Sequence, residues 1–180
     1  MLGVIILKAK NRGIRVMRKI AVLALIILAF GMATAFAEVK TFPDNFTNGL
    51  IVRSECLNDK EFKVIHFFKY IDQPSVKYSI YFSKETMQEF AFEGSFVEIK
   101  VDNNPVQKIN VEEVVNFPIP RRPSFVTSFT RTTIPNDVIT EIKTAKRVAL
   151  RFHFMNGITS DFILPDSLLS EWQQAINTEK

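Results

Sequence analysis

The chain has 180 residues, 23 basic and 19 acidic side chains, a formal net charge of +4 and a single cysteine, Cys56. One cysteine excludes an internal disulfide framework, and this length is enough for a domain held together by its hydrophobic core. Only three glycines but 15 phenylalanines fall within residues 38–180, which excludes a glycine-rich phosphate loop and favours packed β-sheet.

The N-terminal segment has the order of parts found in a secretory signal peptide. Arg18 and Lys19 precede an unbroken apolar run over residues 20–30, and small residues then lead to an Ala-x-Ala site formed by Ala35 and Ala37. This pattern predicts a cleavable signal peptide. The alternative is an uncleaved membrane anchor. The whole apolar stretch, residues 20–36, has 17 residues, which is short beside the roughly 20 that a spanning helix needs.

Cleavage before Glu38 divides the chain into a leader, residues 1–37, and an exported domain, residues 38–180, in the periplasm or outside the cell. Met17 already begins a complete signal of ordinary length, so we expect it to be the true start. The leader holds six of the basic residues and no acidic one, which leaves 17 basic and 19 acidic residues, a net charge of −2. The basic balance therefore gives no indication of nucleic-acid binding, and membrane contact is expected only through the leader.

The first part of the exported region predicts an antiparallel hairpin. Residues 38–48 are polar with a proline and are expected to form an irregular lead-in, followed by a short strand over residues 50–55. Residues 62–71 are rich in β-branched and aromatic side chains, and residues 77–82 alternate apolar with polar. The turn signal Asp-Gln-Pro-Ser at residues 72–75 joins these two strands. Cys56, beside the first strand, is typical of a small buried hydrophobe, and the alternative is a lone thiol that reacts or forms a disulfide between two chains.

The middle of the chain predicts a second hairpin and a proline-rich connection. Residues 83–89 are expected to form a short helical turn, and residues 96–101 and 106–111 are expected to pair around an Asp-Asn-Asn-Pro turn. Residues 116–123, NFPIPRRP, contain three prolines and are expected to be an extended connection or edge, because proline cannot donate to a sheet ladder. Residues 124–132 return to strand.

The C-terminal part predicts two helices around a third hairpin. A helix is expected over residues 135–144, because a proline and two capping residues precede apolar residues at helical spacing. Residues 146–154 and 158–164 form the hairpin. A final helix over residues 166–177 places its leucines, tryptophan and isoleucine on one face.

The register of this third hairpin follows from burial. A one-residue slip would exchange its two faces, and only a three-residue loop over residues 155–157, with its glycine at positive φ, keeps the apolar residues together. In that register Leu150 pairs with Phe162 on the apolar face, and Arg151 opposes Asp161 on the polar face.

Arg151, His153 and Asp161 therefore form a candidate small site on the polar face of the hairpin, although such a trio is more typical of a solvated charge pair with a neighbouring imidazole. A small hydrolase would use His153 or His66, yet the sequence has no nucleophile signature beside either residue. One cysteine and two distant histidines also give no metal-ligand spacing, so no metal or cofactor is predicted.

Arg121 and Arg122, within NFPIPRRP, are the second candidate for binding. The prolines hold the segment extended at low entropic cost, and the two arginines present fixed positive charges to a phosphate, an acidic glycan or an acidic partner. The alternative is a stiff connector whose arginines keep a sheet edge soluble.

The C-terminal pattern consists of a helix, the segment RVALRFHFMNGITSDFILP and a capped helix. This pattern resembles small exported bacterial β-sandwich proteins such as the invasion-associated locus B family. The resemblance covers about half of the exported region and consists of apolar spacing. The cysteines of that family are absent, so no residue roles carry over.

These patterns together predict an α+β fold, mainly antiparallel β, built as a β-sandwich or partly closed barrel of about seven to eight strands with two helices. The predicted function is a non-catalytic exported domain that binds a protein or cell-envelope component. A carrier of a small apolar or lipidic ligand, suggested by the many phenylalanines, and the hydrolase named above are the alternatives.

Overall fold

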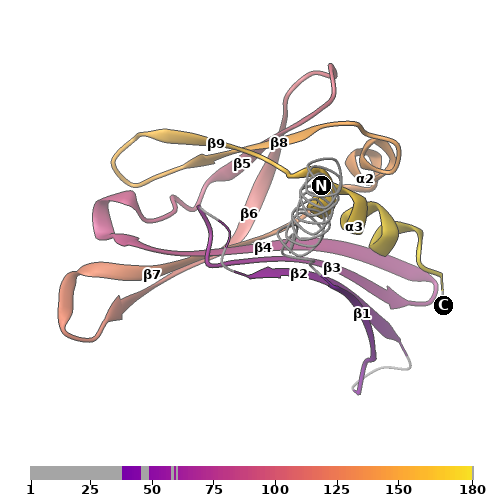
Figure 1. Cartoon of the computed structure of the whole chain (residues 1–180), viewed down its shortest axis with the longest axis horizontal. Helices are drawn as coiled ribbons and strands as arrows, with labels where there is room; N and C mark the ends of the chain where they lie inside the picture. Colours follow the sequence, from indigo (N-terminus) through magenta and orange to yellow (C-terminus); the bar gives the residue numbers. More distant parts are fainter. Residues whose placement is uncertain (1–37, 46–48, 58, 60, 180) are drawn as a thin grey trace, which may run out of the picture. The chain divides into compact units, whose positions relative to one another are not determined.

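The computed structural model describes residues 38–45, 49–57, 59 and 61–179. In this part of the chain it contains nine β-strands, two α-helices and one short 3-10 helix (Figure 1). In chain order these are β1 (Glu38–Pro43), β2 (Leu50–Leu57), β3 (Val64–Asp72), β4 (Ser75–Met87), η1 (Gln88–Phe90), β5 (Phe96–Val101), β6 (Gln107–Ile119), β7 (Arg122–Thr133), α2 (Asn136–Ile142), β8 (Val148–His153), β9 (Thr159–Ile163) and α3 (Asp166–Asn177). The predicted α+β class, the mainly antiparallel sheet and both helices are confirmed. The predicted leader, with the start at Met17 and the cleavage-site residues Ala35 and Ala37, lies outside the described residues.

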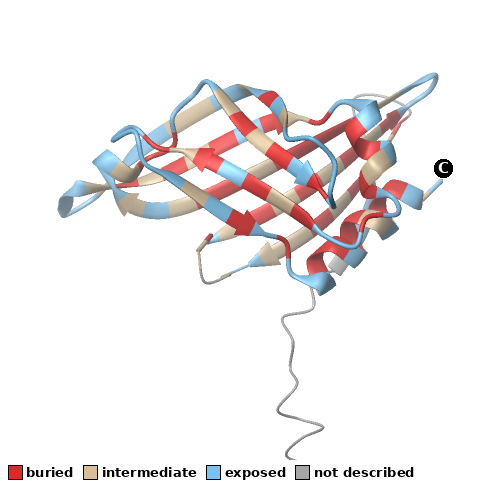
Figure 2. Ribbon diagram, turned by 90° about the horizontal axis from the view of Figure 1, so that it is seen from above, coloured by how far each residue is buried: buried red, intermediate tan, exposed pale blue. Residues whose placement is uncertain are grey.

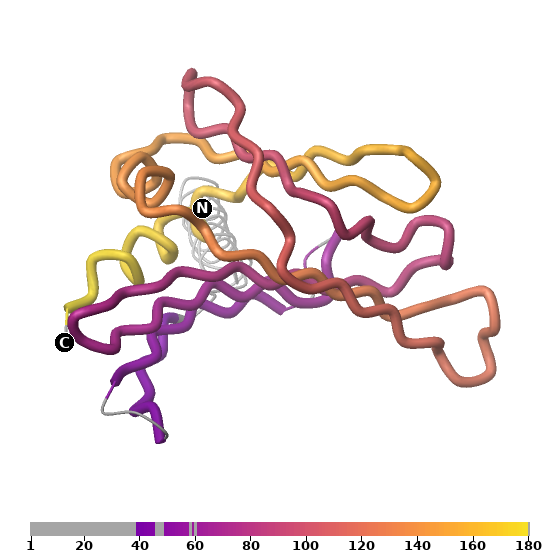
Figure 3. The backbone as a smooth tube through the Cα atoms, turned by 180° about the vertical axis from the view of Figure 1, so that it is seen from behind, coloured from indigo at the N-terminus to yellow at the C-terminus, as the bar shows by residue number. Residues whose placement is uncertain are grey.

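The strands form one antiparallel sheet that bends into two layers. Their order is β1-β2-β3-β4-β7-β6-β5-β8-β9, so β1 and β9 are the two edges of the described sheet and the sheet is not closed. β6 belongs to both layers, because its first residues pair with β5 and the residues from Val111 onward pair with β7. A register shift between Val111 and Glu113 marks a bulge, which bends a strand. Figure 3 shows β6 running from one layer to the other.

We call β1, β2, β3, β4, β7 and the C-terminal part of β6 the larger layer. The smaller layer consists of the first residues of β6 together with β5, β8 and β9. Along the strands, buried residues alternate with more exposed ones (Figure 2), because successive side chains point alternately to the inner face, packed against the other layer, and to the outer face. On β3, for example, Ile65 and Phe67 are fully buried, while His66 and Phe68 are half-buried.

Phenylalanine rings join the two layers at the centre of the core. Phe62, which precedes β3 and is 1% exposed, lies 5.1 Å from Phe82 of β4, 5.2 Å from Phe152 of β8 and 4.9 Å from Phe162 of β9, measured between ring centroids. Phe92 stacks on the same ring at 6.3 Å. Tilted and edge-on ring pairs of this kind add to the stability gained by burial.

Helix α3 covers the inner face of the larger layer at one end, next to α2 (Figure 1). Its Trp172 is fully buried, with its ring centroid 4.9 Å from that of Phe67. Gln173 Nε2 donates to the carbonyl oxygens of Ile142 and Ala145 at 3.0 and 2.9 Å, which ties α3 to the end of α2. The predicted apolar face of the helix is thus the face that packs on the sheet.

The predicted register of the β8–β9 hairpin is confirmed. Leu150 pairs with Phe162, and Arg151 pairs with Asp161. Gly157 has a φ of 77°, the left-handed conformation expected from the three-residue loop.

Three segments differ from expectation. Residues 38–43 form β1, which pairs with β2 along its whole length, so this segment is an edge strand rather than an irregular lead-in. Residues 83–87 continue β4 because they pair with β7, and only the 3-10 helix after them is helical. NFPIPRRP forms the end of the β6–β7 hairpin. Residues 116–119 pair only with β7 and are therefore an edge of the larger layer, as predicted, with a register shift at residues 118–119, where a proline lacks its N–H. Residues 120–121 form a turn between the two strands rather than an extended connection.

Candidate functional site

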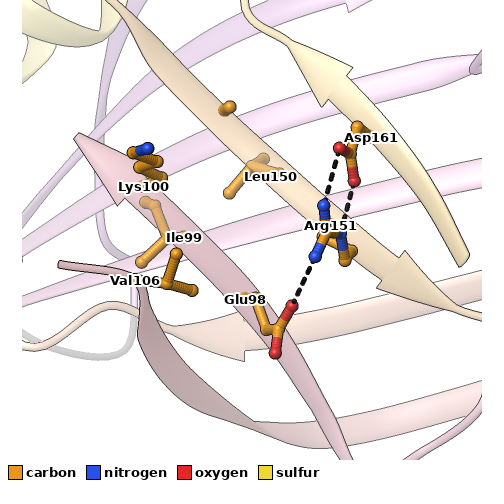
Figure 4. A pocket seen from close by; sticks show the side chains of 8 residues that line it. Glu98, Ile99, Lys100, Val106, Leu150, Arg151 and Asp161 are labelled. Atoms are coloured by element: carbon orange, nitrogen blue, oxygen red, sulfur yellow. Dashed lines mark hydrogen bonds and ion pairs between the residues drawn. The ribbon is translucent and has the colours of Figure 1, made fainter. Parts of the chain in front are cut away.

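Arg151, Asp161 and His153 lie together on the outer face of the smaller layer. Arg151 donates to both carboxylate oxygens of Asp161, from Nε at 2.6 Å and from Nη2 at 2.9 Å. Glu98 of β5 joins them, with its Oε2 3.6 Å from Arg151 Nη1 (Figure 4). The same oxygen lies 4.0 Å from His153 Nε2. The pairing of β5 with β8 places Glu98 directly opposite Arg151.

The charges in this cluster hold one another in their ionised forms. The hydrogen bonds and positive charge of Arg151 keep the pKa of Asp161 below its usual value. The hydrogen bonds and negative charge of Asp161 keep the pKa of Arg151 above the usual value of an arginine. Both side chains are exposed to solvent, so water screens the pair. This arrangement suits the positioning of a guanidinium more than the transfer of a proton.

A hollow of about 670 Å³ lies beside the Arg151–Asp161 pair, in the size range of small-ligand sites. We call it the cationic groove; it is lined by Lys100, Asp102, Asn103, Lys146, Arg147, Ala149, Arg151, Asp161 and Ile163. A smaller hollow of about 80 Å³ shares part of this lining and adds Glu98, Ile99, Val106 and Leu150 (Figure 4).

The acidic side chains of the cationic groove are already engaged. Asp102 Oδ1 accepts hydrogen bonds from the backbone N–H groups of Lys146 and Arg147 at 2.9 and 2.8 Å, and Asp161 is held by Arg151. The side chains of Lys100, Lys146 and Arg147 are exposed and form no ion pair or hydrogen bond with other described residues. The groove therefore presents three cationic side chains without an ion-pair partner, and with Arg151, Asp161 and Asp102 counted its lining has a net charge of +2.

The other predicted pair, Arg121 and Arg122, belongs to a different part of the sheet. Both are exposed at the tip of the β6–β7 hairpin, and neither lines the cationic groove. Arg121 is in the left-handed region with a φ of 65°, and the Arg122 guanidinium lies 5.2 Å from the centroid of the Phe125 ring. The structure thus separates the two predicted binding candidates.

Each histidine lies against a glutamate and an aromatic ring. His66 Nε2 is 3.1 Å from Glu55 Oε1, and this contact keeps the pKa of Glu55 below its usual value. The imidazole ring of His66 stacks on the ring of Tyr81. The His153 ring centroid lies 4.5 Å from that of Phe96. Among the described residues, neither imidazole hydrogen-bonds a serine, threonine or cysteine side chain, and no group of three potential metal ligands occurs.

Cys56 packs against the core, and the phenylalanines between the two layers form part of it. Cys56 is half-buried against the core cluster, and burial raises the pKa of its thiol, as expected of a small hydrophobe. The rings between the layers contact one another, so the space that a carrier of apolar ligands would use is occupied at this point by Phe62 and its neighbours.

Four residues of this site were missed from the sequence: Glu98, Lys100, Lys146 and Arg147. The sequence shows that Glu98 and Lys100 alternate with apolar residues in a strand and that Lys146 and Arg147 precede one. It does not show that these four residues lie close together, because that depends on the pairing of β5 with β8 across about 50 residues of chain. Only the Arg151–Asp161 contact, which lies within one hairpin, could be found from local spacing.

No family model matches the sequence, and no curated protein matches it. Among solved structures, the fold is similar to the crystal structure of invasion associated protein B from Bartonella henselae, with a TM-score of 0.46 and 9% sequence identity. The superposition covers 78% of this chain and 92% of that one. In the described part of the chain, no helix is both long and apolar enough to cross a membrane.

Proposed function

We propose that residues 38–180 form an exported, non-catalytic domain that binds an anionic component of the cell envelope through the cationic groove. One observation carries this proposal: three exposed cations surround a hollow whose carboxylates are already engaged. A domain with a net charge of −2 has no general excess of cations, so their gathering around one hollow favours a local anionic ligand.

Export is supported by the leader pattern, and N-terminal sequencing of the secreted or periplasmic protein tests it. We expect the mature chain to begin at Glu38, whereas Ala37→Tyr should keep the leader attached, because the cleavage site accepts small residues. An unprocessed wild-type chain retained inside the cell would contradict this part of the proposal.

Two double variants with the same change in charge test the groove: Lys100→Glu with Arg147→Glu, and Arg121→Glu with Arg122→Glu at the hairpin tip. The probes are vesicles of phosphatidylglycerol, vesicles of phosphatidylcholine, and inorganic phosphate in solution. Each cation near an anionic surface contributes about 1 kcal/mol, so the groove variant should bind phosphatidylglycerol vesicles more than about tenfold more weakly. Thermal unfolding of both variants should stay close to that of the wild type.

The same measurements separate the possible sources of the anion. Binding of inorganic phosphate alone would identify a small solute, and binding of phosphatidylglycerol vesicles would identify a lipid surface. Equal binding by the wild type and the groove variant would overturn the assignment to the groove. A loss confined to the tip variant would transfer the site to Arg121 and Arg122.

A further inference from the structure

The outer face of the larger layer carries an unbroken row of aromatic rings, which we call the aromatic ladder. Each ring contacts the next, with centroid separations between 5.4 and 5.8 Å. In order, the ladder consists of Tyr70, Phe68 and His66 along β3, Tyr81 on β4, Phe129 on β7 and Phe117 on β6. It therefore crosses four neighbouring strands.

These rings are not part of the core. Tyr81 lies between Ile80 and Phe82, whose fully buried side chains point to the inner face, so its own side chain points outward. The five rings from β3, β4 and β7 are half-buried against their neighbours, and Phe117 is 57% exposed. A contiguous aromatic surface of this kind marks a binding face more often than scattered exposed residues do.

Most of the charges on this face are paired, and Lys77, which opposes Tyr70 on β4, is exposed and forms no ion pair with other described residues. Near β3, Glu55 lies 2.9 Å from Arg53 Nη2 and 3.1 Å from His66 Nε2. Beside Tyr81, the Arg131 guanidinium lies 3.7 Å from Glu112 and 3.6 Å from Glu113. Single-stranded nucleic acid and anionic lipid need several uncompensated positive charges along such rings, and one lysine at the end of the ladder does not supply them, so this face does not suit these ligands.

The same charged groups disfavour a dry protein interface. The contact between Glu55 and His66 lies within the ladder itself, and Arg53 pairs with the same carboxylate. The centre of a protein interface is depleted in charged residues, because burying them without full compensation costs free energy. An uncharged, hydrated partner with its own hydroxyl groups would leave these side chains hydrogen-bonded.

We propose that the aromatic ladder binds a neutral polysaccharide chain laid across β3, β4, β7 and β6. The electron-rich ring faces receive the C–H faces of sugar rings. The hydroxyls of Tyr70 and Tyr81 and the flanking Arg–Glu pairs hydrogen-bond the sugar hydroxyls. This site lies on the other layer from the cationic groove and does not depend on it.

Native gel electrophoresis through gels containing a neutral polysaccharide tests the proposal, with hydroxyethyl cellulose, dextran, glycogen and galactomannan as separate probes. The wild-type domain should be retarded by at least one of them, and added salt should not reverse the retardation. Phe117→Ala and Tyr81→Leu should each weaken the retardation at least tenfold. Ile158→Ala, which removes a similarly exposed side chain next to the β8–β9 hairpin and outside the cationic groove, should leave it unchanged.

Thermal unfolding of each variant verifies that it is folded, and Phe117→Ala is the safer variant because its side chain is the most exposed of the six. Failure of all four polysaccharides to retard the wild-type domain would overturn the proposal, as would retardation insensitive to both ladder variants. A wild-type dimer that Phe117→Ala converts to a monomer in sedimentation would assign the face to self-association instead. The groove variant Lys100→Glu with Arg147→Glu should be retarded like the wild type, so the two proposed sites can fail independently.

Discussion

Lys84 lies on the inner face of β4 among aromatic side chains. Its Nζ is 3.6 Å from the centroid of the Phe154 ring and 5.5 Å from that of Phe92, which favours the protonated form. Burial opposes this and lowers the pKa of Lys84 from 10.5 to about 8. A base whose pKa falls on folding destabilises the folded state while it is charged. Stability is therefore gained as pH rises from about 8 toward the ordinary lysine value, because only the folded state has lost the proton.

Replacement of Lys84 by methionine should remove this dependence on pH. We expect Lys84→Met to be about 1 kcal/mol more stable than the wild type at about pH 7, after allowance for partial exposure to water, and the difference should shrink at about pH 9.5. Urea unfolding of both proteins at the two pH values measures it. An unchanged difference would mean that the ring faces, rather than burial, control the protonation of Lys84.

Lys69, only 6% exposed on β3, anchors the end of α3 to the sheet. Its Nζ donates to the carbonyl oxygens of Ile176 and Thr178 at 2.7 and 2.6 Å, groups that the end of a helix leaves without a partner. Lys69→Met keeps the aliphatic stem but loses both bonds, and should lower the free energy of unfolding by about 2 kcal/mol. Lys77→Met, on the exposed part of β4, is the control and should change it by less than about 0.5 kcal/mol. Equal effects in urea unfolding would remove the anchoring role from Lys69.

At the level of the elements, the turn between β8 and β9 depends on Gly157. Its φ of 77° is unfavourable for a residue with a Cβ atom, although an added Cβ would have no heavy atom within 4 Å. Gly157→Ala should therefore cost about 1 kcal/mol from backbone strain alone, and Gly157→Asn should cost less, because asparagine tolerates this region. Chemical denaturation of the two variants provides the measurement. A stable alanine variant would show that the hairpin can adopt a different turn.

The elements that the sequence predicts well are those whose pattern is local. The two helices and the β8–β9 register follow from apolar spacing and one glycine, since a slip would expose Leu150 and Phe162. The polar composition of residues 83–87 favours a helical turn, but these residues form a strand because they pair with β7. Such tertiary pairing overrides a weak local preference.

The candidate surfaces were predicted less well for the same reason. Arg151 and Asp161 could be placed together from one hairpin, but Lys100 reaches them only through the β5–β8 pairing. Tyr81 and Phe129 of the aromatic ladder come from strands that are far apart in the sequence and adjacent in the sheet. A single sequence contains each strand but not the order of strands that creates these surfaces.

At the scale of the whole described region, the bend at β6 produces two layers whose outer faces differ in chemistry. The smaller layer presents unpaired cations beside a hollow, and the larger layer presents aromatic rings among paired charges. The inner faces share one core, because Phe82 of β4 and Phe152 of β8 lie 4.8 Å apart. Substitutions on one outer face should therefore leave the other face unchanged as long as this shared core stays intact.

This shared core predicts that both layers unfold in one transition. Phe152 is 1% exposed and contacts rings from both layers, so Phe152→Ala should lower the free energy of unfolding by about 3–5 kcal/mol. The fluorescence of Trp172, between α3 and the larger layer, and the circular dichroism of the whole sheet should shift together. Ile163→Ala, at 48% exposed, is the control and should shift neither by more than about 0.5 kcal/mol. If the circular dichroism changed in two steps while the Trp172 transition stayed in place, the layers would be independent folding units, and the bend at β6 would be a hinge rather than part of one cooperative sheet.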